Sequence, residues 1–93
     1  MYGIFTANNR VASINEALYQ LLKRFDCIDS SNQIEIASIN SLYYEFQLRK
    51  QLFSTNTSWI IGDCYYPWRE TMKAIDDIAA LYYTHKLLTI QAC

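Results

Sequence analysis

The sequence has little glycine, little proline and almost no histidine. Two glycines, one proline and one histidine occur among 93 residues. So few glycines and prolines argue against a fold built from many tight turns, such as a small β-barrel or sandwich. Gly3 and Gly62 stand far apart, so the chain contains no glycine-rich phosphate-binding loop. The single histidine, His85, leaves few ways to build a metal centre.

An excess of charge of either sign is also lacking. Eight basic and nine acidic residues give a formal net charge of −1. Basic residues pair only as Lys23-Arg24 and Arg49-Lys50, each near the end of an expected helix, and no basic stripe runs along the chain. This balance argues against nucleic acid as a partner. A net charge near zero favours association with proteins, because little repulsion keeps molecules apart.

No uncharged run is long enough to cross a membrane. The longest, residues 51–62, has twelve residues, whereas a spanning helix needs about 20. The first ten residues have neither a basic start nor a long apolar run, so we expect no signal peptide. Cys27, Cys64 and Cys93 form an odd number without a C-x-x-C pair, which predicts reduced thiols and a cytoplasmic location.

Apolar spacing indicates three helices. Ser13 and Glu16 match a capping box, and the apolar stripe behind them predicts a helix over 14–26. A second helical pattern covers 40–53 and could begin near residue 32, although residues 33–39 also alternate like a strand. Pro67 suits the first turn of a third helix, 67–90. Its second half is apolar on nearly every side, so it should lie centrally in the fold or at an interface between copies.

Two segments favour an extended backbone. Residues 2–7 are apolar, and a turn is expected at Asn8-Asn9. Residues 59–66 are rich in aromatic and β-branched side chains. Together with the helices, these segments predict one domain spanning residues 1–93. Its expected fold class is mainly α, a compact bundle of three or four helices with one or two short extended segments.

Residues that could perform chemistry are scattered. A zinc site would have to draw Cys27, Cys64 and His85 from three separate elements. Cys64 and His85 could in principle act as nucleophile and base, but neither a nucleophile elbow nor a glycine-rich oxyanion turn flanks them. The carboxylates of Asp76 and Asp77 fall within a helix, which is typical of a solvated face. We therefore expect no enzymatic activity, no metal and no cofactor.

The densest cluster of large side chains is the segment 59–69, which reads W-I-I-G-D-C-Y-Y-P-W-R. Trp, Tyr and Arg are the residue types that dominate binding hot spots. We predict that this segment contacts a partner protein through Trp59, Tyr65, Tyr66, Trp68 and Arg69. The alternative is that it covers the core and buries both tryptophans. Because neighbours on an extended chain point to opposite faces, the two adjacent tyrosines cannot both face inward.

The tripeptide Tyr65-Tyr66-Pro67, leading into a helix, is similar to the Tyr-Tyr-Pro segment of the colicin DNase immunity proteins. The resemblance covers three residues, and in those four-helix proteins the segment binds the toxin. It implies that such a segment can serve as a protein-binding surface. The sequence thus leads to the hypothesis of a small non-catalytic protein that binds and sterically blocks a partner. Inhibitors from phages or mobile elements, such as anti-CRISPR proteins, and toxin-neutralising immunity proteins act in this way.

Two other functions fit the same sequence. A dimeric helical DNA-binding regulator would read DNA with the helix 40–53 and dimerise through the helix 67–90. The residues offered to bases and phosphates would be Gln47, Arg49, Lys50 and Gln51. A self-assembling structural subunit would associate through the helix 67–90 alone.

Overall fold

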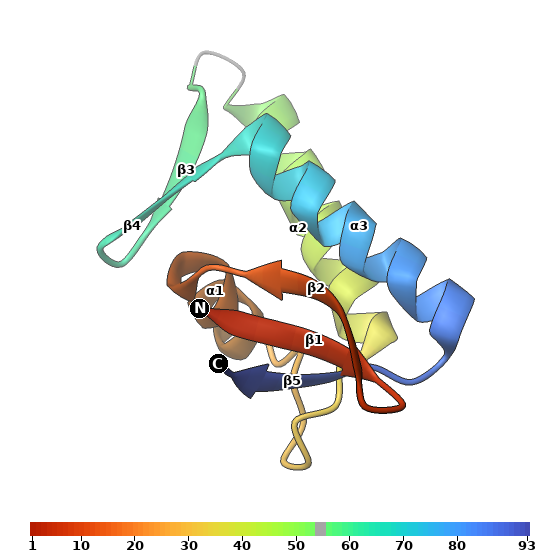
Figure 1. The fold of residues 1–93 in the computed structure, drawn as a ribbon. Coiled ribbons are helices and arrows are strands. Elements are labelled where there is room, and N and C mark those ends of the chain that lie inside the picture. Colours follow the sequence, from red (N-terminus) through yellow and green to blue (C-terminus); the bar gives the residue numbers. More distant parts are fainter. Residues whose placement is uncertain (54–55) are drawn as a thin grey trace.

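The computed structural model describes residues 1–53 and 56–93, and it overturns the expected fold class. These residues form three helices and two antiparallel sheets, so the fold is mixed α and β and the expected all-α bundle is wrong (Figure 1). In chain order the elements are β1 (Tyr2–Thr6), β2 (Asn9–Ile14), α1 (Glu16–Arg24), α2 (Ile36–Leu52), β3 (Ser58–Ile61), β4 (Cys64–Pro67), α3 (Trp68–His85) and β5 (Thr89–Ala92).

One sheet has the strand order β2-β1-β5, with β1 antiparallel to both neighbours. The expected extended segment at 2–7 is β1, but the turn lies one residue earlier than predicted. Ala7 (φ 47°) and Asn8 (φ 71°) both have the left-handed backbone that a two-residue type I′ hairpin requires. Val11 is the extra residue of a bulge, because Phe5 pairs with Arg10 and Ile4 with Ala12.

Helix α1 confirms the first predicted helix but corrects its start. Ser13 lies in β2, and Asn15 is the capping residue instead. The Leu18 backbone N–H donates to Asn15 Oδ1 at 2.8 Å, which satisfies one of the amides left free at a helix start. The predicted capping box of Ser13 and Glu16 is therefore wrong, because the serine that it needs belongs to a strand.

The other two helices differ from the prediction mainly in length. Helix α2 begins at Ile36, so most of the ambiguous segment 33–39 is helical. Helix α3 ends at His85, because Lys86 adopts a left-handed backbone (φ 68°), and residues 89–92 turn back as β5. The predicted helix 67–90 is thus too long at its end. Helices α2 and α3 pack side by side against one face of the three-stranded sheet (Figure 1).

A single apolar core joins the sheet to the helices. The sheet contributes Ile4 and Ile90, and α1 contributes Leu21 and Leu22. The long helices add Ile39, Leu42 and Phe46 from α2, and Ile75 and Ile78 from α3. Cys27 is fully buried among these residues, and burial raises the pKa of its thiol to about 12.

Within residues 1–53 and 56–93, no helix combines the length and the apolar character of a membrane span.

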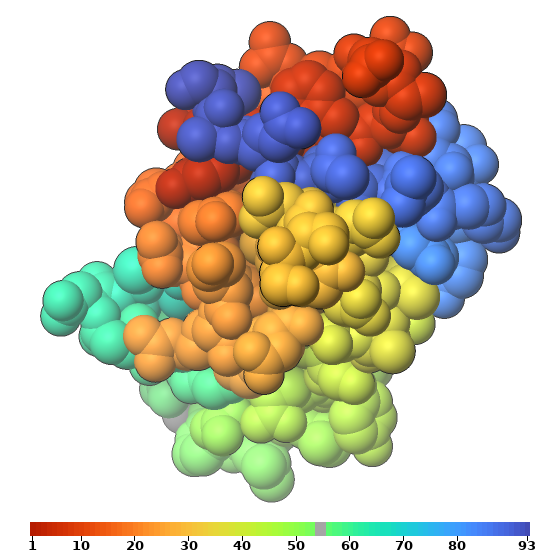
Figure 2. All heavy atoms as spheres, turned by 90° about the horizontal axis from the view of Figure 1, so that it is seen from below, coloured from red at the N-terminus to blue at the C-terminus, as the bar shows by residue number. Residues whose placement is uncertain are grey.

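The second sheet is the hairpin β3–β4, which stands out from the rest of the molecule. Figure 1 shows it beyond the ends of α2 and α3, and Figure 2 shows its tip projecting at one side of the molecule. The predicted extended segment 59–66 lies within this hairpin. The fold therefore presents the aromatic segment as a protruding element.

Candidate protein-binding surface

A tight turn at Gly62-Asp63 brings β3 and β4 together. Gly62 has a φ of 60°, and Asp63 does not share this left-handed backbone. Glycine at the first central position is the pattern of a type II′ turn, whose twist matches the strands that it joins. The register places Trp59 opposite Tyr66 and Ile60 opposite Tyr65. Because side chains alternate along a strand, one of these pairs faces the body of the protein and the other faces away.

The inward pair belongs to an aromatic cluster of Phe46, Trp59, Tyr66 and Trp68. The Phe46 ring centroid lies 4.9 Å from that of Trp59, 5.7 Å from Trp68 and 6.4 Å from Tyr66, each in an edge-to-face arrangement. The rings of Trp59 and Trp68 stack with centroids 6.4 Å apart. Edge-to-face and stacked aromatic pairs add about 0.5–1.5 kcal/mol each beyond the area that they bury. The cluster therefore fixes the hairpin to α2 and α3 from the inside.

Hydrogen bonds complete the attachment of two predicted site residues. The Tyr66 hydroxyl donates to the Ala17 carbonyl at 2.7 Å, and Trp68 Nε1 donates to the Asn56 carbonyl at 2.9 Å. Tyr66 and Trp68 are only 5% and 4% exposed. Burial raises the pKa of Tyr66 to about 12, and a hydrogen bond with Cys64 makes a smaller contribution in the same direction. Both side chains lie in the core, and Trp59 is half-buried beside them.

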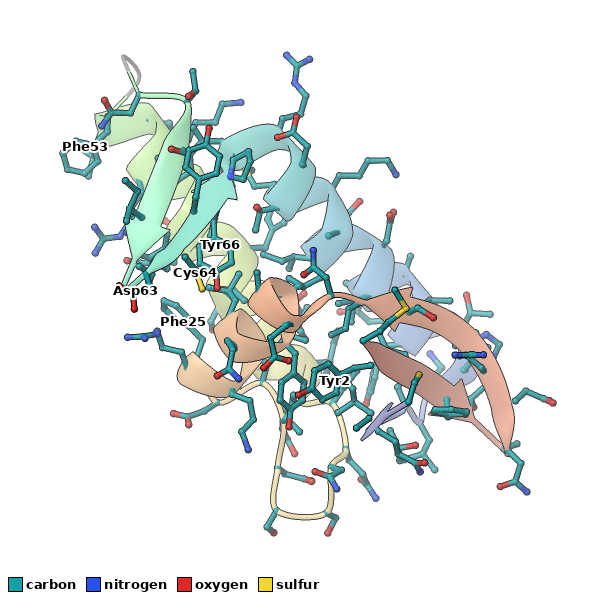
Figure 3. All side chains as sticks on the ribbon, turned by 60° about the vertical axis from the view of Figure 1, so that its left-hand side comes forward. Tyr2, Phe25, Phe53, Asp63, Cys64 and Tyr66 are labelled. Carbon is teal, nitrogen blue, oxygen red and sulfur yellow. The ribbon has the colours of Figure 1, made fainter. Side chains whose placement is uncertain are left out.

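The outward pair is exposed. Tyr65 is 58% exposed and Ile60 is 68% exposed. As the sequence predicted, one of the two adjacent tyrosines faces inward and the other reaches the surface. Phe53, which follows α2, is also exposed and points away from the body beside the hairpin (Figure 3). We call Phe53, Ile60 and Tyr65 the hairpin surface. Arg69 lies nearby on the first turn of α3 and is exposed.

A hollow separates the end of α2 from the hairpin. It has a volume of about 590 Å³, and Phe53, Ile60, Trp59 and Arg49 are among the residues that line it. The Arg49 guanidinium lies 4.3 Å from the centroid of the Trp59 ring, and its Nε donates to Glu45 Oε1 at 3.0 Å. Glu45 and Arg49 thus form an i,i+4 ion pair on α2. The Arg49 guanidinium and the Trp59 ring thus lie together in the wall of the hollow.

Sequence reasoning found part of this surface. Of the five predicted contact residues, Tyr65 and Arg69 are exposed, Trp59 is half-buried, and Tyr66 and Trp68 are buried, so the prediction that all five contact a partner is wrong for Tyr66 and Trp68. Ile60 was not predicted. Its exposure could have been inferred, because a strand that turns Trp59 inward turns the next side chain outward. Phe53 was not predicted either, since its exposure depends on where α2 ends.

The residues considered for catalysis or metal binding are not brought together. Cys64 lies at the start of β4, and His85 is the last residue of α3, an 18-residue helix about 27 Å long. In the described part of the chain, no three His, Cys, Asp or Glu side chains are placed to hold a metal ion. Asp76 and Asp77 are exposed, and Lys73 Nζ lies 3.2 Å from Asp77 Oδ2.

The geometry thus offers a projecting hairpin, an aromatic cluster that fixes it from the inside, and an exposed apolar surface beside a hollow. Comparisons of the chain with protein-family models, with curated proteins and with solved structures find no match.

Proposed function

We propose that this protein is a small non-catalytic inhibitor that binds a partner protein through the hairpin surface and blocks it sterically. One observation carries the proposal: the hairpin projects from the body with Ile60 and Tyr65 both more than half exposed. Each Å² of apolar surface that a partner buries stabilises the complex by about 25 cal/mol. A clustered apolar surface on a protruding element is typical of an interaction site.

The aromatic cluster supports this function in an indirect way. Trp59, Tyr66 and Trp68 hold the hairpin in place, so the exposed side chains are already positioned before a partner arrives. Binding then costs less ordering entropy, which increases affinity. In this proposal Tyr65 and Arg69 touch the partner, whereas Tyr66 and Trp68 act by positioning them.

The hollow beside the hairpin indicates what the partner supplies. Hot spots of protein interfaces are side chains that fill a pocket on the other surface. A partner side chain that is flat and apolar would stack between Phe53 and the wall formed by Arg49 and Trp59. Arg69 follows the lining residue Trp68 on the first turn of α3, and it favours an acidic group on the partner. We further propose a cytoplasmic location, since Cys27, Cys64 and Cys93 are all free thiols.

A matched pair of tyrosine variants tests the proposal. Tyr65 on the hairpin and Tyr44 on α2 are 58% and 60% exposed, so Tyr65→Ala and Tyr44→Ala remove the same side chain from different surfaces. The tagged protein is used to capture partners from lysate of its host, in reductant and moderate salt. We expect a stoichiometric protein that wild type and Tyr44→Ala retain and that Tyr65→Ala loses, with equal melting temperatures for all three.

Three outcomes would overturn the proposal. A partner that Tyr65→Ala still captures with wild-type affinity would exclude the hairpin surface. Capture of nuclease-sensitive nucleic acid alone would favour the DNA-binding regulator. Recovery of the protein only with copies of itself, at a mass that rises with concentration, would favour the self-assembling subunit.

A further inference from the structure

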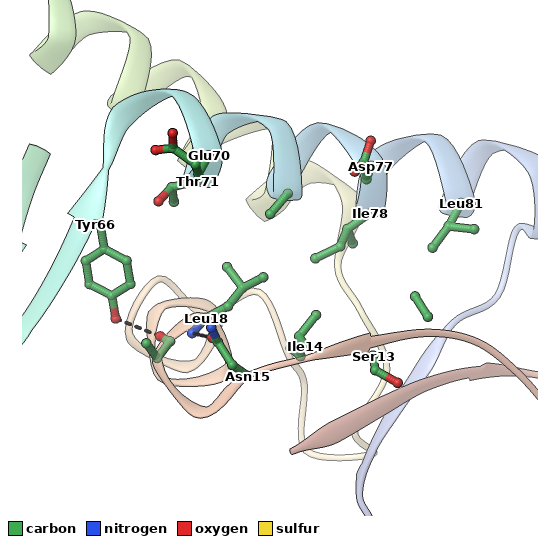
Figure 4. A pocket seen from close by; sticks show the side chains of 13 residues that line it. Ser13, Ile14, Asn15, Leu18, Tyr66, Glu70, Thr71, Asp77, Ile78 and Leu81 are labelled. Carbon is green, nitrogen blue, oxygen red and sulfur yellow. Dashed lines mark hydrogen bonds between the residues drawn. The ribbon is translucent and has the colours of Figure 1, made fainter. Parts of the chain in front are cut away.

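A second surface, distinct from the hairpin surface, lies between strand β2 and helix α3. A hollow of about 350 Å³ opens there, bounded by β2 and the start of α1 on one side and by α3 on the other (Figure 4). A shallower hollow of about 390 Å³ continues it toward the end of α3, and Ala12, Asp77 and Leu81 line both. The two form one groove, which we call the β2–α3 groove.

The strand presents its edge to this groove. β2 is the outermost strand of its sheet, so only β1 pairs with it among the described elements. The four consecutive residues Ala12 to Asn15 line the first hollow. Since successive side chains of a strand point to opposite faces, consecutive lining residues mean that the strand turns its edge toward the groove. An open edge is a template for pairing with another extended chain.

The bulge divides β2 into two halves with different capacities for pairing. Val11 interrupts the ladder, and bulges of this kind protect sheet edges from unwanted pairing. The residues beyond it, Ala12 to Ile14, keep a regular register with Ile4, Gly3 and Tyr2. The regular half is also the half that borders the larger hollow. The part of the edge that can pair is therefore the part that has room for a partner.

The dimensions of the groove match a short extended peptide. Its α3 wall runs from Glu70 to Thr84, about 21 Å at 1.5 Å per helical residue. An extended chain of about six residues covers the same length at 3.3 Å per residue. Small and aliphatic side chains, among them Ala74, Ile78 and Leu81, line this wall. Thr71 is 7% exposed, and its hydroxyl faces the hollow (Figure 4).

The charge of the groove selects the kind of peptide. Glu70 and Asp77 lie on the α3 side of the groove, and neither Lys, Arg nor His lines either hollow. Lys73 binds Asp77, which leaves Glu70 without an ion pair in the part of the chain that the structure describes. A cationic side chain on the peptide would complement this acidic side. A neutral or acidic peptide would gain nothing from it.

We propose that the β2–α3 groove binds an extended segment of a partner protein that alternates basic and apolar side chains. The segment adds as a strand to Ala12–Ile14, places its apolar side chains against Ala74 and Ile78, and directs its basic side chains toward Glu70. The main-chain hydrogen bonds supply affinity, and the alternating side chains supply selectivity. This site does not depend on the hairpin surface.

The probe is a fluorescein-labelled hexapeptide with alternating Lys and Val, measured by fluorescence anisotropy. One control peptide has Glu in place of every Lys. The other carries methyl groups on alternate backbone nitrogens, which prevents its pairing with a strand. We expect binding of the Lys-Val peptide and at least about tenfold weaker binding of both controls. On the wild-type protein, hydrogen exchange of the backbone amides in residues 12–14 should slow when the peptide is added, because strand addition protects them.

Variants on α3 place the peptide in the groove. Ala74→Phe fills the apolar wall and should abolish binding, with a melting curve to confirm that it folds. Glu70→Gln should weaken binding about two- to fivefold, the size expected for an exposed ion pair. Asp76→Asn is the matched control, because Asp76 lies on α3 but lines neither hollow of the groove, and it should bind like wild type.

Several results would reject the proposal. They are absence of binding at millimolar peptide, equal affinity for the methylated control, and protection of amides outside residues 12–14. If Ala74→Phe does not fold, two measurements still test the proposal. They are the amide protection in wild type and the comparison of Glu70→Gln with Asp76→Asn. A protein that dimerises by itself with residues 12–14 protected would show that a second copy fills the groove, which also contradicts a partner peptide.

Discussion

Adjacent residues of β4 have opposite roles, and the difference follows from the alternation of a strand. Tyr66 points inward, donates its hydroxyl to the Ala17 carbonyl and packs against Phe46. Tyr65 points outward and makes up part of the hairpin surface. A substitution at Tyr66 should therefore act on stability, whereas one at Tyr65 should act on the partner binding that we propose. Tyr65 makes none of the ring contacts of the aromatic cluster, so substitutions at Tyr65 and at Tyr66 can be tested separately.

Trp68→Ala should be strongly destabilising. It removes a 4% exposed indole that stacks on Trp59 and donates to the Asn56 carbonyl, so we expect the free energy of unfolding to fall by about 3–5 kcal/mol. Tyr65→Ala should change it by no more than about 0.5 kcal/mol, as exposed substitutions usually do. Urea denaturation followed by circular dichroism measures both. Equal effects of the two variants would contradict the inward and outward assignment.

Tyr66 should make stability depend on alkaline pH. Its pKa is raised to about 12 in the folded protein, against a usual value near 10, so the folded state holds the phenol proton more tightly. The resulting stabilisation is complete below pH 10 and is lost as the pH rises from 10 toward 12. We therefore expect Tyr66→Phe to be less stable than wild type at pH 8 by about 1 kcal/mol, since the Ala17 carbonyl loses its donor.

The difference between wild type and Tyr66→Phe should then shrink between pH 10 and pH 12, as urea denaturation at a series of pH values would show. The comparison must be made between the two proteins, because burial also raises the pKa of Cys27 to about 12. Both proteins share that thiol, so its contribution cancels. A stability difference that stays constant from pH 8 to pH 12 would show that the Tyr66 phenol titrates normally.

At the scale of elements, the boundaries depend on single residues that carry weak signals in the sequence. Local periodicity predicted the apolar stripe of α1, and aromatic and β-branched composition predicted the extended backbone of residues 59–66. Strand β2 was missed because Ser13 and Glu16 imitate a capping box. Strand β5 was missed because Leu87–Ile90 prolongs the apolar pattern of α3, and neither glycine nor proline marks the helix end.

Lys86 ends α3 in a left-handed backbone that an L-residue other than Gly or Asn rarely adopts (φ 68°). Lys86→Gly should therefore stabilise the protein by about 0.5–1 kcal/mol, because glycine has no Cβ to oppose this conformation. Lys86→Ala is the control, since it removes the same charge and the contact with the Tyr83 ring but keeps the strain. Urea denaturation should rank Gly above Ala. The opposite order would show that the helix end is not strained.

At the scale of the whole molecule, what local patterns could not predict is the pairing of distant segments. β1 lies between β2, its neighbour in sequence, and β5, the last element of the chain. Tyr2 pairs with Ala92 and Ile4 with Ile90, and no local sequence motif predicts such a contact. The same limit applies to function. The aromatic segment was visible in the sequence, but the β2–α3 groove exists only after β2 and α3 have been placed.

Removal of the last strand should prevent folding. A chain that ends at Leu87 lacks Leu88 and Ile90, which are fully or almost fully buried, and leaves one side of β1 unpaired. We expect it to lose its cooperative thermal transition and its near-ultraviolet circular dichroism. A chain that ends at Ile90 keeps both core residues and two of the four pairs with β1, and should retain a cooperative transition.

The position of β1 also sets an order in time. The ribosome makes β1 before the other described elements, yet this central strand acquires its second partner only after residues 89–92 have emerged. Until then a nascent chain exposes one edge of β1 and the apolar side chain of Ile4 to its surroundings. Contacts between segments so far apart also slow folding, because the closure of a long loop must precede them. This protein should thus complete its core only after residues 89–92 have been made, and a chaperone that shields β1 would raise its yield.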